Sequence, residues 1–237
     1  MSQKRALYQV DPNELPRYSL EEAARYVDMP KTTVHNWVSG RQYKNSSGTR
    51  NWANLIQRPV ADDGRLSFSN LIEIYVLSAL RKQFRVKMRE VRAALQYTQD
   101  QLKIGRVLLS PHLRATEGNV FLEHLGSLIN IGKGGQEAFP EIFQAYLARI
   151  EWNLQGFPRR VFPLTREDFH SAPRLVAIDP TVAFGRPVLE RRGVKTATIA
   201  ERFFQAGESI HEIAEDFDLE AFEVEEAIRY EGSHLAA

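Results

Sequence analysis

The chain has no cysteine among its 237 residues. This absence excludes disulfide bonds, thiolate nucleophiles and zinc sites built on cysteine ligands, and it is typical of a reducing compartment. Long apolar runs are missing too, since none approaches the roughly 18 residues that a membrane span needs. The basic residues near the start are followed by no apolar signal core. We therefore expect a cytoplasmic protein with no membrane partner.

The rest of the composition is that of an ordinary globular protein. Apolar residues make up 43% of the chain and charged residues 26%, which excludes wholesale disorder. At about 150 residues per domain, the length fits one or two domains. A chain of this size buries roughly 70% of its surface, so it can form a sizeable core.

The net charge of +1 conceals an uneven distribution along the chain. Residues 1–110 carry 18 Lys and Arg against 10 Asp and Glu, whereas residues 111–237 carry 13 against 20. The final stretch, 196–237, has two arginines and 11 acids. A basic half attracts a phosphate backbone and an acidic end repels it. Such blocks are also often no more than solvated surface.

Residues 18–38 predict two helices joined by a tight turn. Ser19 and Glu22 have the spacing of a capping box, which begins a helix. Pro30 suits the first turn of the second helix, because its missing N–H costs nothing there. Apolar and small side chains recur with helical spacing and would bring the helices close together. These positions are Leu20, Ala23, Ala24, Val27, Val34, Trp37 and Val38.

The other face of the second predicted helix carries polar side chains and no acid. They are Lys31, Thr32, Thr33, His35 and Asn36. Side chains of these kinds reach base edges and phosphates when a helix lies in a major groove. A plain helical hairpin with a solvated polar face is the alternative.

The same segment resembles the winged helix-turn-helix of the MerR and excisionase type. That pattern is an aromatic residue, Ser or Thr, two variable residues and Glu-Ala-Ala, then a turn and Thr-Val-x-x-Trp. Met29 departs from it, since a capping Ser is common there. By resemblance, His35 and Asn36 are the base- and phosphate-contacting residues. The matching positions are Tyr18, Ser19, Glu22, Ala23, Ala24, Thr33, Val34 and Trp37.

Residues 39–66 are interpreted as the wing. Gly40 ends the helix, and residues 45–48 have the composition of a turn. Basic and aromatic side chains are interleaved here in a way that suits phosphate contacts, although each could equally lie on a solvated loop. These candidates are Arg41, Tyr43, Lys44, Arg50 and Arg58.

Two further helices follow residues 66–71, and their apolar stripes indicate core rather than a cofactor site. The first stripe is Leu71, Ile72, Tyr75, Ala79 and Leu80, and the second is Met88, Val91, Leu95 and Leu102. The order of wing and helix pair again resembles the MerR type.

The middle of the chain predicts a small β meander and a helix. A turn at 116–119 separates apolar segments, and strand character falls on Val120, Leu122 and residues 128–131. Residues 132–135 lack the phosphate-loop pattern, so we interpret them as a plain loop. A helix is predicted from about Phe139, with Phe143, Tyr146, Leu147 and Ile150 buried. Residues 159–163 predict a short strand.

Residues 176–189 predict two strands around a turn, and three helical segments follow. Gly207 closes the first helix, and Ser209 with Glu212 forms a second capping box. Phe222, Val224, Ala227 and Ile228 form the stripe of the last helix. This region resembles domain-of-unknown-function family 433, which occurs in bacterial antitoxins. The matching positions are Ile178, Pro180, residues 185–188, Ala206, Gly207, Ser209, residues 212–216 and Tyr230, while residues 191–193 replace the usual Gly-Thr-Arg.

Enzyme signatures are weak. The six histidines are scattered and form no H-E-x-x-H pair, and the chain has no nucleophile elbow, Rossmann fingerprint or kinase motif. His211 and Glu215 are one helical turn apart, which favours an exposed charge pair over a metal site. We expect no enzyme, no cofactor and no metal.

We therefore predict a mainly α fold with small β elements. It comprises an N-terminal winged helix-turn-helix (MerR-like), a central β meander plus helix, and a C-terminal three-helix domain that is itself helix-turn-helix-like. The domain boundaries are placed at 1–170 and 171–237.

The order of the two regions resembles VapB-type antitoxins of type II toxin–antitoxin systems. The resemblance implies a repressor that binds double-stranded DNA at its own promoter. It also implies a cognate toxin, usually a PIN-domain ribonuclease, that is neutralised by direct binding. We expect a homodimer, because paired half-sites add to specificity. A stand-alone MerR-like regulator and a scaffold that binds no DNA remain alternatives.

The acidic C-terminal region suggests a role in these contacts. Its charge argues against DNA binding there. We hypothesise that it mediates dimerisation or meets a basic, RNA-binding surface of the partner, through carboxylates such as Glu223, Glu225 and Glu226.

Overall fold

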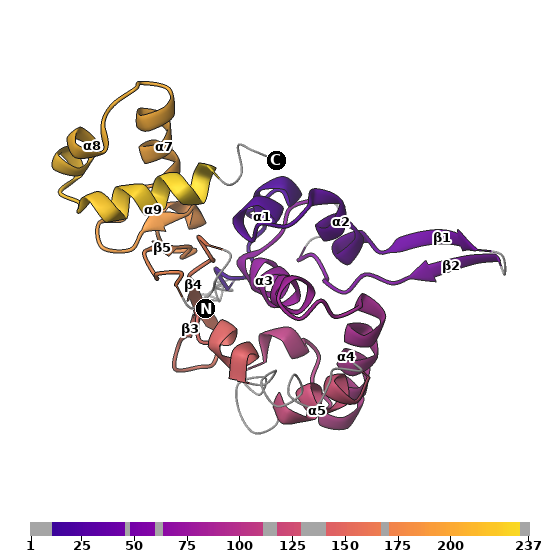
Figure 1. The fold of residues 1–237 in the computed structure, drawn as a ribbon. Helices are drawn as coiled ribbons and strands as arrows, with labels where there is room; N and C mark the ends of the chain where they lie inside the picture. Colours follow the sequence, from indigo (N-terminus) through magenta and orange to yellow (C-terminus); the bar gives the residue numbers. More distant parts are fainter. Residues whose placement is uncertain are drawn as a thin grey trace, which may run out of the picture.

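The structure is a computed structural model that describes residues 11–45, 48–59, 64–110, 118–128, 141–166 and 171–232. Helices dominate the described chain, and the strands form three antiparallel pairs (Figure 1). The predicted mainly α fold with small β elements is confirmed. Within the described ranges, no helix combines the length and the apolar character that a membrane crossing requires.

The N-terminal pair of helices is α1 (Leu20–Tyr26) and α2 (Lys31–Ser39). The predicted capping box is present, because Ser19 Oγ accepts a hydrogen bond from Glu22 N at 3.1 Å and Glu22 Oε2 accepts one from Ser19 N at 2.9 Å. Pro30 is the N-cap residue of α2 and so lies one position before its first turn. The apolar faces of both helices are buried as predicted, and Ala23, Ala24, Val34, Trp37 and Val38 belong to one core cluster.

A β-hairpin directly follows α2. Strands β1 (Arg41–Asn45) and β2 (Gly48–Trp52) pair with Arg41 opposite Trp52, and the hairpin projects away from the helices (Figure 1). Gly40 turns the chain with a left-handed φ of 76°, and a Cβ here would lie 2.5 Å from the Trp52 carbonyl oxygen. Only glycine fits such a position, so Gly40 allows the base of the hairpin to approach the end of α2 closely.

Helix α3 (Phe68–Lys82) is the centre of the N-terminal core, and α4 (Met88–Leu102) packs beside it. Every residue of α3 from Phe68 to Leu80 is buried, which confirms the predicted stripe and extends it around the helix. The polar Glu73 is accommodated by a bidentate ion pair with Arg106, which precedes the short η1 helix (Val107–Leu109). In α4, Val91 and Leu95 are buried as predicted.

The predicted meander is wrong at its first strands, because helix α5 (Gly118–Leu128) occupies this part of the chain. Phe121, Leu122 and Leu125 are all buried, and their spacing places them on one face of a helix. A short apolar stretch fits both the two-residue period of a strand and the 3.6-residue period of a helix. Packing against α4 selects the helix. Residues 129–131 and the loop 132–135 lie outside the described residues.

The next helix ends earlier than predicted. Residues 141–147 are helical, with Phe143, Tyr146 and Leu147 buried, whereas the predicted start at Phe139 lies outside the described residues. Ile150 is not helical but begins strand β3 (Ile150–Trp152), where it pairs with Val161 of β4 (Pro158–Val161). Strand β4 confirms the short strand predicted there.

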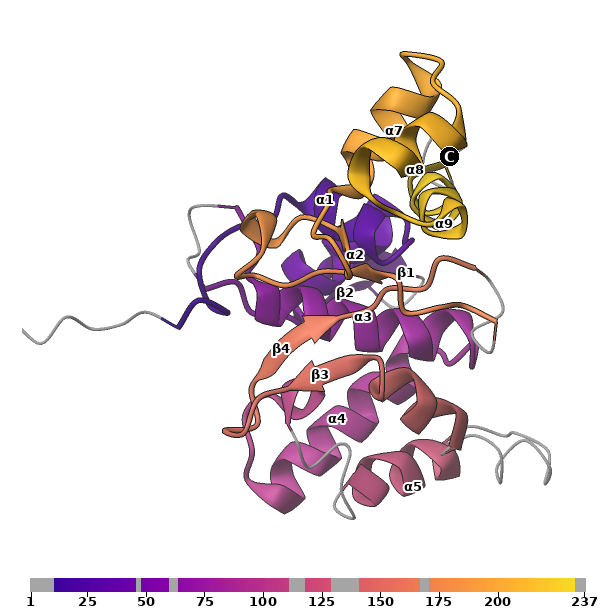
Figure 2. The ribbon, with the colours of Figure 1, turned by 90° about the vertical axis from the view of Figure 1, so that its left-hand side faces the viewer.

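The C-terminal part contains strands β5 (Val176–Ala177) and β6 (Val188–Leu189) with the short η3 (Ala183–Gly185) between them. Helices α7 (Thr196–Phe204), α8 (Ile210–Phe217) and α9 (Ala221–Gly232) follow, and Ser209 and Glu212 form the second predicted capping box. These helices enclose an apolar cluster of their own and lie at the opposite end of the molecule from α4 and α5 (Figure 2).

One residue of the predicted α9 stripe is misplaced. Phe222 is 56% exposed, while Val224 and Ala227 are buried. Two helical positions correspond to about 200°, so a residue two before Val224 faces the opposite side. The boundary predicted near residue 170 falls among residues 167–170, which the structure does not describe, and it stays a prediction.

Candidate nucleic-acid interface

A cavity of about 320 Å³ opens between α2, the hairpin, the end of α3 and the start of α4. We call it the basic groove, because no Asp or Glu is among the described residues that line it. Five of its side chains carry a positive charge. The lining residues are Thr33, Asn36, Trp37, Arg41, Trp52, Arg81, Lys87, Met88, Arg89 and Arg92.

The structure brings some of the predicted DNA-contacting residues together in this groove. Thr33, Asn36 and Arg41 line it. Lys31, Thr32 and His35 lie on the same helix and are exposed. Lys31 is engaged by an exposed ion pair with Glu21 of α1, at 2.9 Å between Nζ and Oε2.

The remaining predicted contacts are not brought together by the described structure. Arg58 is half-buried and is not among the groove residues. Tyr43, Lys44 and Arg50 lie on the two hairpin strands, and their side chains are outside the described part of the chain.

Four cations of the groove were missed by reasoning from the sequence. Arg81 belongs to the end of α3, Lys87 is the N-cap residue of α4, and Arg89 and Arg92 lie in its first turns. The helical periodicity of these segments points only to their apolar stripes. A usable signal was present, since residues 81–89 contain five Lys and Arg and no acid.

The groove cations differ in their surroundings. Arg92 Nη1 donates a hydrogen bond to the Ala53 carbonyl at 2.6 Å, and its guanidinium lies 5.2 Å from the centre of the Trp52 ring. Arg92 therefore holds the base of the hairpin against α4. Arg89 pairs with Glu90 at 2.6 Å.

Three groove cations are exposed and have no ion-pair partner among the described residues. They are Arg41, Arg81 and Lys87. Each can displace a counterion from a phosphate without first breaking a bond within the protein. This arrangement is chemically suited to the backbone of a nucleic acid.

The far side of α1 is held by the C-terminal part. Gly185 has a left-handed φ of 76° and lies against the Tyr18 side chain, where a Cβ would meet the hydroxyl. Arg186 binds the Glu22 carboxylate and donates to Tyr26 Oη at 3.1 Å. Tyr230 of α9 donates to the Tyr26 carbonyl at 3.3 Å. The N-terminal helix pair is thus joined to the C-terminal part through α1.

Two of the three carboxylates proposed to contact a partner are buried. Glu226 is 1% exposed, and it accepts hydrogen bonds from Thr165, Arg229 and Arg166, the last at 2.7 Å. Burial acts to raise the pKa of Glu226, but the hydrogen bonds from Arg166 and Thr165 outweigh it and lower the pKa. Glu223 pairs with Arg191 at 2.8 Å. These acids hold the fold together, and Glu225 alone of the three is exposed.

The predicted pair of one histidine and one glutamate is present on α8. His211 Nε2 lies 3.4 Å from Glu215 Oε1, and both side chains are largely exposed. In the described ranges, no three His, Asp or Glu side chains gather closely enough to hold a metal ion.

Comparison with known proteins identifies relatives of both parts. Residues 16–95 match a family described as "Putative DNA-binding HTH domain", and residues 176–230 match "Protein of unknown function (DUF433)". The chain is 26% identical over 231 residues to "Putative antitoxin VapB45" of Mycobacterium tuberculosis, a match that covers 91% of this chain and 93% of the relative. The predicted resemblance to VapB-type antitoxins with an N-terminal helix-turn-helix is confirmed.

A solved structure shares the fold. The crystal structure of Rv2018 from Mycobacterium tuberculosis superimposes with a TM-score of 0.64 at 22% identity. The match covers 90% of this chain and 98% of the other. The arrangement of helices and hairpins is therefore common to both chains along nearly their full length.

Proposed function

We propose that this chain is an antitoxin that binds DNA through its N-terminal half and a cognate toxin through its C-terminal half. The name of the M. tuberculosis relative and the match to a DNA-binding helix-turn-helix support the two roles. The observation that carries the DNA-binding role is the basic groove beside α2, which has three exposed and unpaired cations and no acid among its described residues.

In this proposal α2 is the recognition helix and the hairpin is the wing of a MerR-type module. Thr33, His35 and Asn36 read base edges in the major groove. A second set contacts phosphates and fixes the register, with its cations neutralising charge and its Thr and Tyr hydroxyls donating hydrogen bonds. That second set comprises Lys31, Thr32, Arg41, Tyr43, Lys44, Arg50 and Arg58 from the sequence, and Arg81, Lys87 and Arg89 from the groove. The target is the promoter of the chain's own operon, bound by a homodimer across two half-sites.

The toxin is proposed to be a PIN-domain ribonuclease. The C-terminal part, with helices α7 to α9, would occlude or distort the active site of the toxin by direct contact. The buried Glu223 and Glu226 are not available for such a contact, whereas Glu201, Glu220 and Glu225 are exposed and have no ion pair among the described residues. A basic, RNA-binding surface of the toxin is the charge-complementary partner for them.

The DNA-binding role is tested by fluorescence anisotropy with promoter DNA and a scrambled duplex of equal length. We expect the native chain to prefer the promoter and the triple variant Thr33→Ala, His35→Ala, Asn36→Ala to lose that preference. Each specific base contact contributes about 1–3 kcal/mol of discrimination. A control variant with Gln96→Ala and Gln101→Ala on the exposed face of α4 should bind as the native chain does. Equal affinity of the native chain for both duplexes would contradict the proposal.

The antitoxin role is tested by a growth assay with the adjacent open reading frame. Arrest when that frame is expressed alone, and rescue when this chain is co-expressed, would support the proposal. No arrest with a working expression control, together with promoter binding, would favour a stand-alone regulator. No DNA binding either would favour a scaffold.

The proposed contact between the exposed carboxylates and the toxin is tested on the toxin complex itself. The variant Glu201→Gln, Glu220→Gln, Glu225→Gln should bind the toxin more weakly and with less dependence on salt. The charge-matched control is Asp100→Asn, Glu123→Gln, Glu141→Gln, whose exposed acids lie outside the C-terminal part. If both variants bound the toxin equally, the acidic surface would have no part in recognition.

A further inference from the structure

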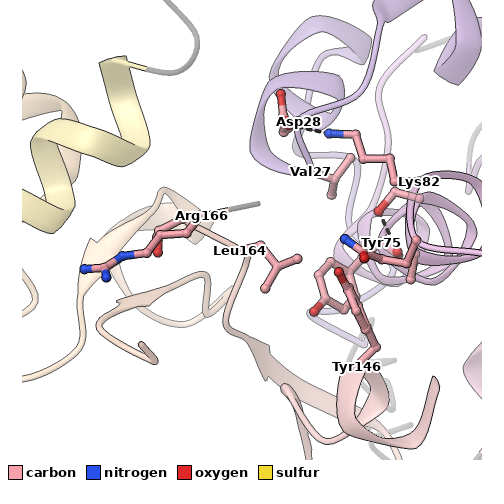
Figure 3. Close-up of a pocket in the computed structure, with 11 residues that line it drawn as sticks. Val27, Asp28, Tyr75, Lys82, Tyr146, Leu164 and Arg166 are labelled. Atoms are coloured by element: carbon pink, nitrogen blue, oxygen red, sulfur yellow. Dashed lines mark hydrogen bonds and ion pairs between the residues drawn. The ribbon is translucent and has the colours of Figure 1, made fainter. Parts of the chain in front are cut away.

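A second and larger cavity, of about 710 Å³, lies where the helix-turn-helix meets the start of the C-terminal part. Its walls come from the end of α1, one face of α3, the helix 141–147 and residues 164–166 (Figure 3). A volume of this size is typical of pockets that bind small molecules. None of its lining residues belongs to the basic groove.

Two tyrosines form one wall of this cavity. Tyr75 of α3 and Tyr146 have ring centres 6.4 Å apart, and their side chains lie next to each other (Figure 3). Tyr75 is only 3% exposed, yet its hydroxyl finds no acceptor for its proton among the described residues. Burial raises the pKa of Tyr75, so the hydroxyl keeps its proton and remains a hydrogen-bond donor. A buried donor with nothing to donate to is costly unless a ligand or water satisfies it.

The positive charge next to Tyr75 belongs to Arg149, which has no carboxylate partner in the described part of the chain. Arg149 is 4% exposed, and its guanidinium donates to four backbone carbonyl oxygens at 2.8–3.1 Å. Burial raises the pKa of Tyr75, and the positive charge of Arg149 opposes this effect without outweighing it. Arginine does not lose its proton in proteins, so this part of the fold carries a fixed buried cation.

The remaining walls combine apolar surface with three exposed charged side chains, Asp28, Lys82 and Arg166. Val27, Ala79 and Leu164 contribute the apolar part, and Figure 3 shows Leu164 between the two tyrosines and Arg166. Arg166 itself is held by Glu226 of α9. Lys82 lies on the rim, where it pairs with Asp28 in an exposed contact that a ligand could replace.

We propose that this cavity binds a small organic anion with an apolar body. The carboxylate of the ligand accepts the hydrogen bond from Tyr75 in the field of Arg149 and Lys82, and its body lies against Leu164 and Val27. An anion supplies both missing elements at once, namely the acceptor for a buried hydroxyl and the counter-charge for a buried arginine.

The proposal is tested on the full chain by isothermal titration calorimetry with three probes. Benzoate has the charge and the body, benzamide has the body without the charge, and acetate has the charge without the body. We expect benzoate to bind at least tenfold more tightly than either of the others. Titration to about 10 mM is sufficient, because a dissociation constant of 1 mM needs only about 4 kcal/mol, or roughly 0.5 kcal/mol for each non-hydrogen atom of benzoate.

Two variants locate the site. Tyr75→Phe keeps the ring and removes the hydroxyl, and it should weaken benzoate binding by about tenfold or more, as expected for a hydrogen bond to a charged group. Lys82→Gln should weaken it less, because its charge is exposed. The matched controls are Tyr97→Phe and Lys103→Gln, which lie on α4 and at its end, away from the cavity.

Three results would overturn the proposal. They are no benzoate binding, benzamide binding as tight as that of benzoate, or unchanged affinity in Tyr75→Phe. None of them affects the proposed antitoxin role, because promoter and toxin binding are measured separately. Conversely, failure of the DNA or toxin assays leaves the ligand test intact.

Discussion

Arg186 binds Glu22, the carboxylate that also caps the first helix of the helix-turn-helix. Glu22 Oε2 accepts from Ser19 N at 2.9 Å, while Oε1 accepts from the Arg186 guanidinium. Burial acts to raise the pKa of Glu22, but the hydrogen bonds to Ser19 and Arg186 outweigh it and lower the pKa. One side chain therefore joins a local capping interaction to a contact that spans 164 positions of sequence.

The strength of this link can be measured with a double-mutant cycle. We expect Arg186→Gln and Glu22→Gln to show a coupling free energy of about 0.5–1 kcal/mol in urea denaturation, because the pair is only partly shielded from water. The same cycle on Lys31 and Glu21, which are more exposed, should give a smaller coupling. Additive effects of the Arg186 and Glu22 substitutions would show that the contact does not join the two parts energetically.

Gly185 lies so close to Tyr18 that any side chain at position 185 should destabilise the fold. Gly185→Ala should lower the free energy of unfolding by about 1–3 kcal/mol more than Gly207→Ala does. Both glycines have left-handed φ, at 76° and 72°, so the backbone strain is matched. A Cβ at Gly207 would meet nothing within 4 Å, so the difference isolates the contact with Tyr18. Equal losses in the two variants would place the whole effect in the backbone.

The salt dependence of DNA binding should follow from the groove cations that have no ion-pair partner among the residues described by the structure. Arg81→Gln with Lys87→Gln should weaken binding to all duplexes and reduce the slope of log K against log salt by about 0.9 for each phosphate that is no longer neutralised. Preference for the promoter should persist, since these side chains carry no sequence information. The control Lys103→Gln with Arg159→Gln removes two exposed cations outside the groove. A slope that changed equally in both variants would show that only total charge matters.

The contribution of Glu226 to the free energy of unfolding should be lost at acid pH. Its pKa is lowered from the ordinary 4.5 in the folded chain, so the stabilisation is fully present above that value and is lost as the pH falls through the lower, folded pKa. At pH 7, Glu226→Gln should lower the free energy of unfolding by about 1–3 kcal/mol, because Arg166 and Arg229 lose their partner.

The difference between native and Glu226→Gln chains should shrink below pH 4.5. Denaturant titrations at pH 7, 5 and 3.5 measure it. The neighbouring exposed Glu225→Gln serves as the control and should have little effect at any of these values. A difference that stayed constant to pH 3.5 would be inconsistent with an ionised, bonded Glu226.

The sequence was sufficient to predict a helix where a capping signal and the spacing of apolar residues agreed. Ser19 and Ser209 each begin a helix with a reciprocal partner three residues on, and both capping boxes are present. The inward face of α2 was predicted because Val34, Trp37 and Val38 follow helical spacing, and all three are buried. The existence of three C-terminal helices followed in the same way.

The sequence was insufficient where long-range packing decided. The apolar residues of α5 allow two periods, and only their burial against α4 selects the helix. Glu226 looks like one acid in an acidic run, and nothing local shows that Thr165 and Arg166 surround it. Arg81 and Lys87 belong to helices whose apolar stripes were correctly predicted, but their position beside the hairpin depends on how α3 and α4 cross α2.

The contact between Tyr230 and Tyr26 has a consequence for the order in which the protein is made. The two residues are 204 positions apart, and ribosomes add roughly 5–20 residues per second. The helix-turn-helix therefore leaves the ribosome about 10–40 seconds before α9 can dock on it. Arg92 is the last residue of the basic groove, so in the later part of that interval the nascent chain carries all groove residues without the C-terminal helices. A polysome therefore presents the segments of the groove before it presents finished molecules.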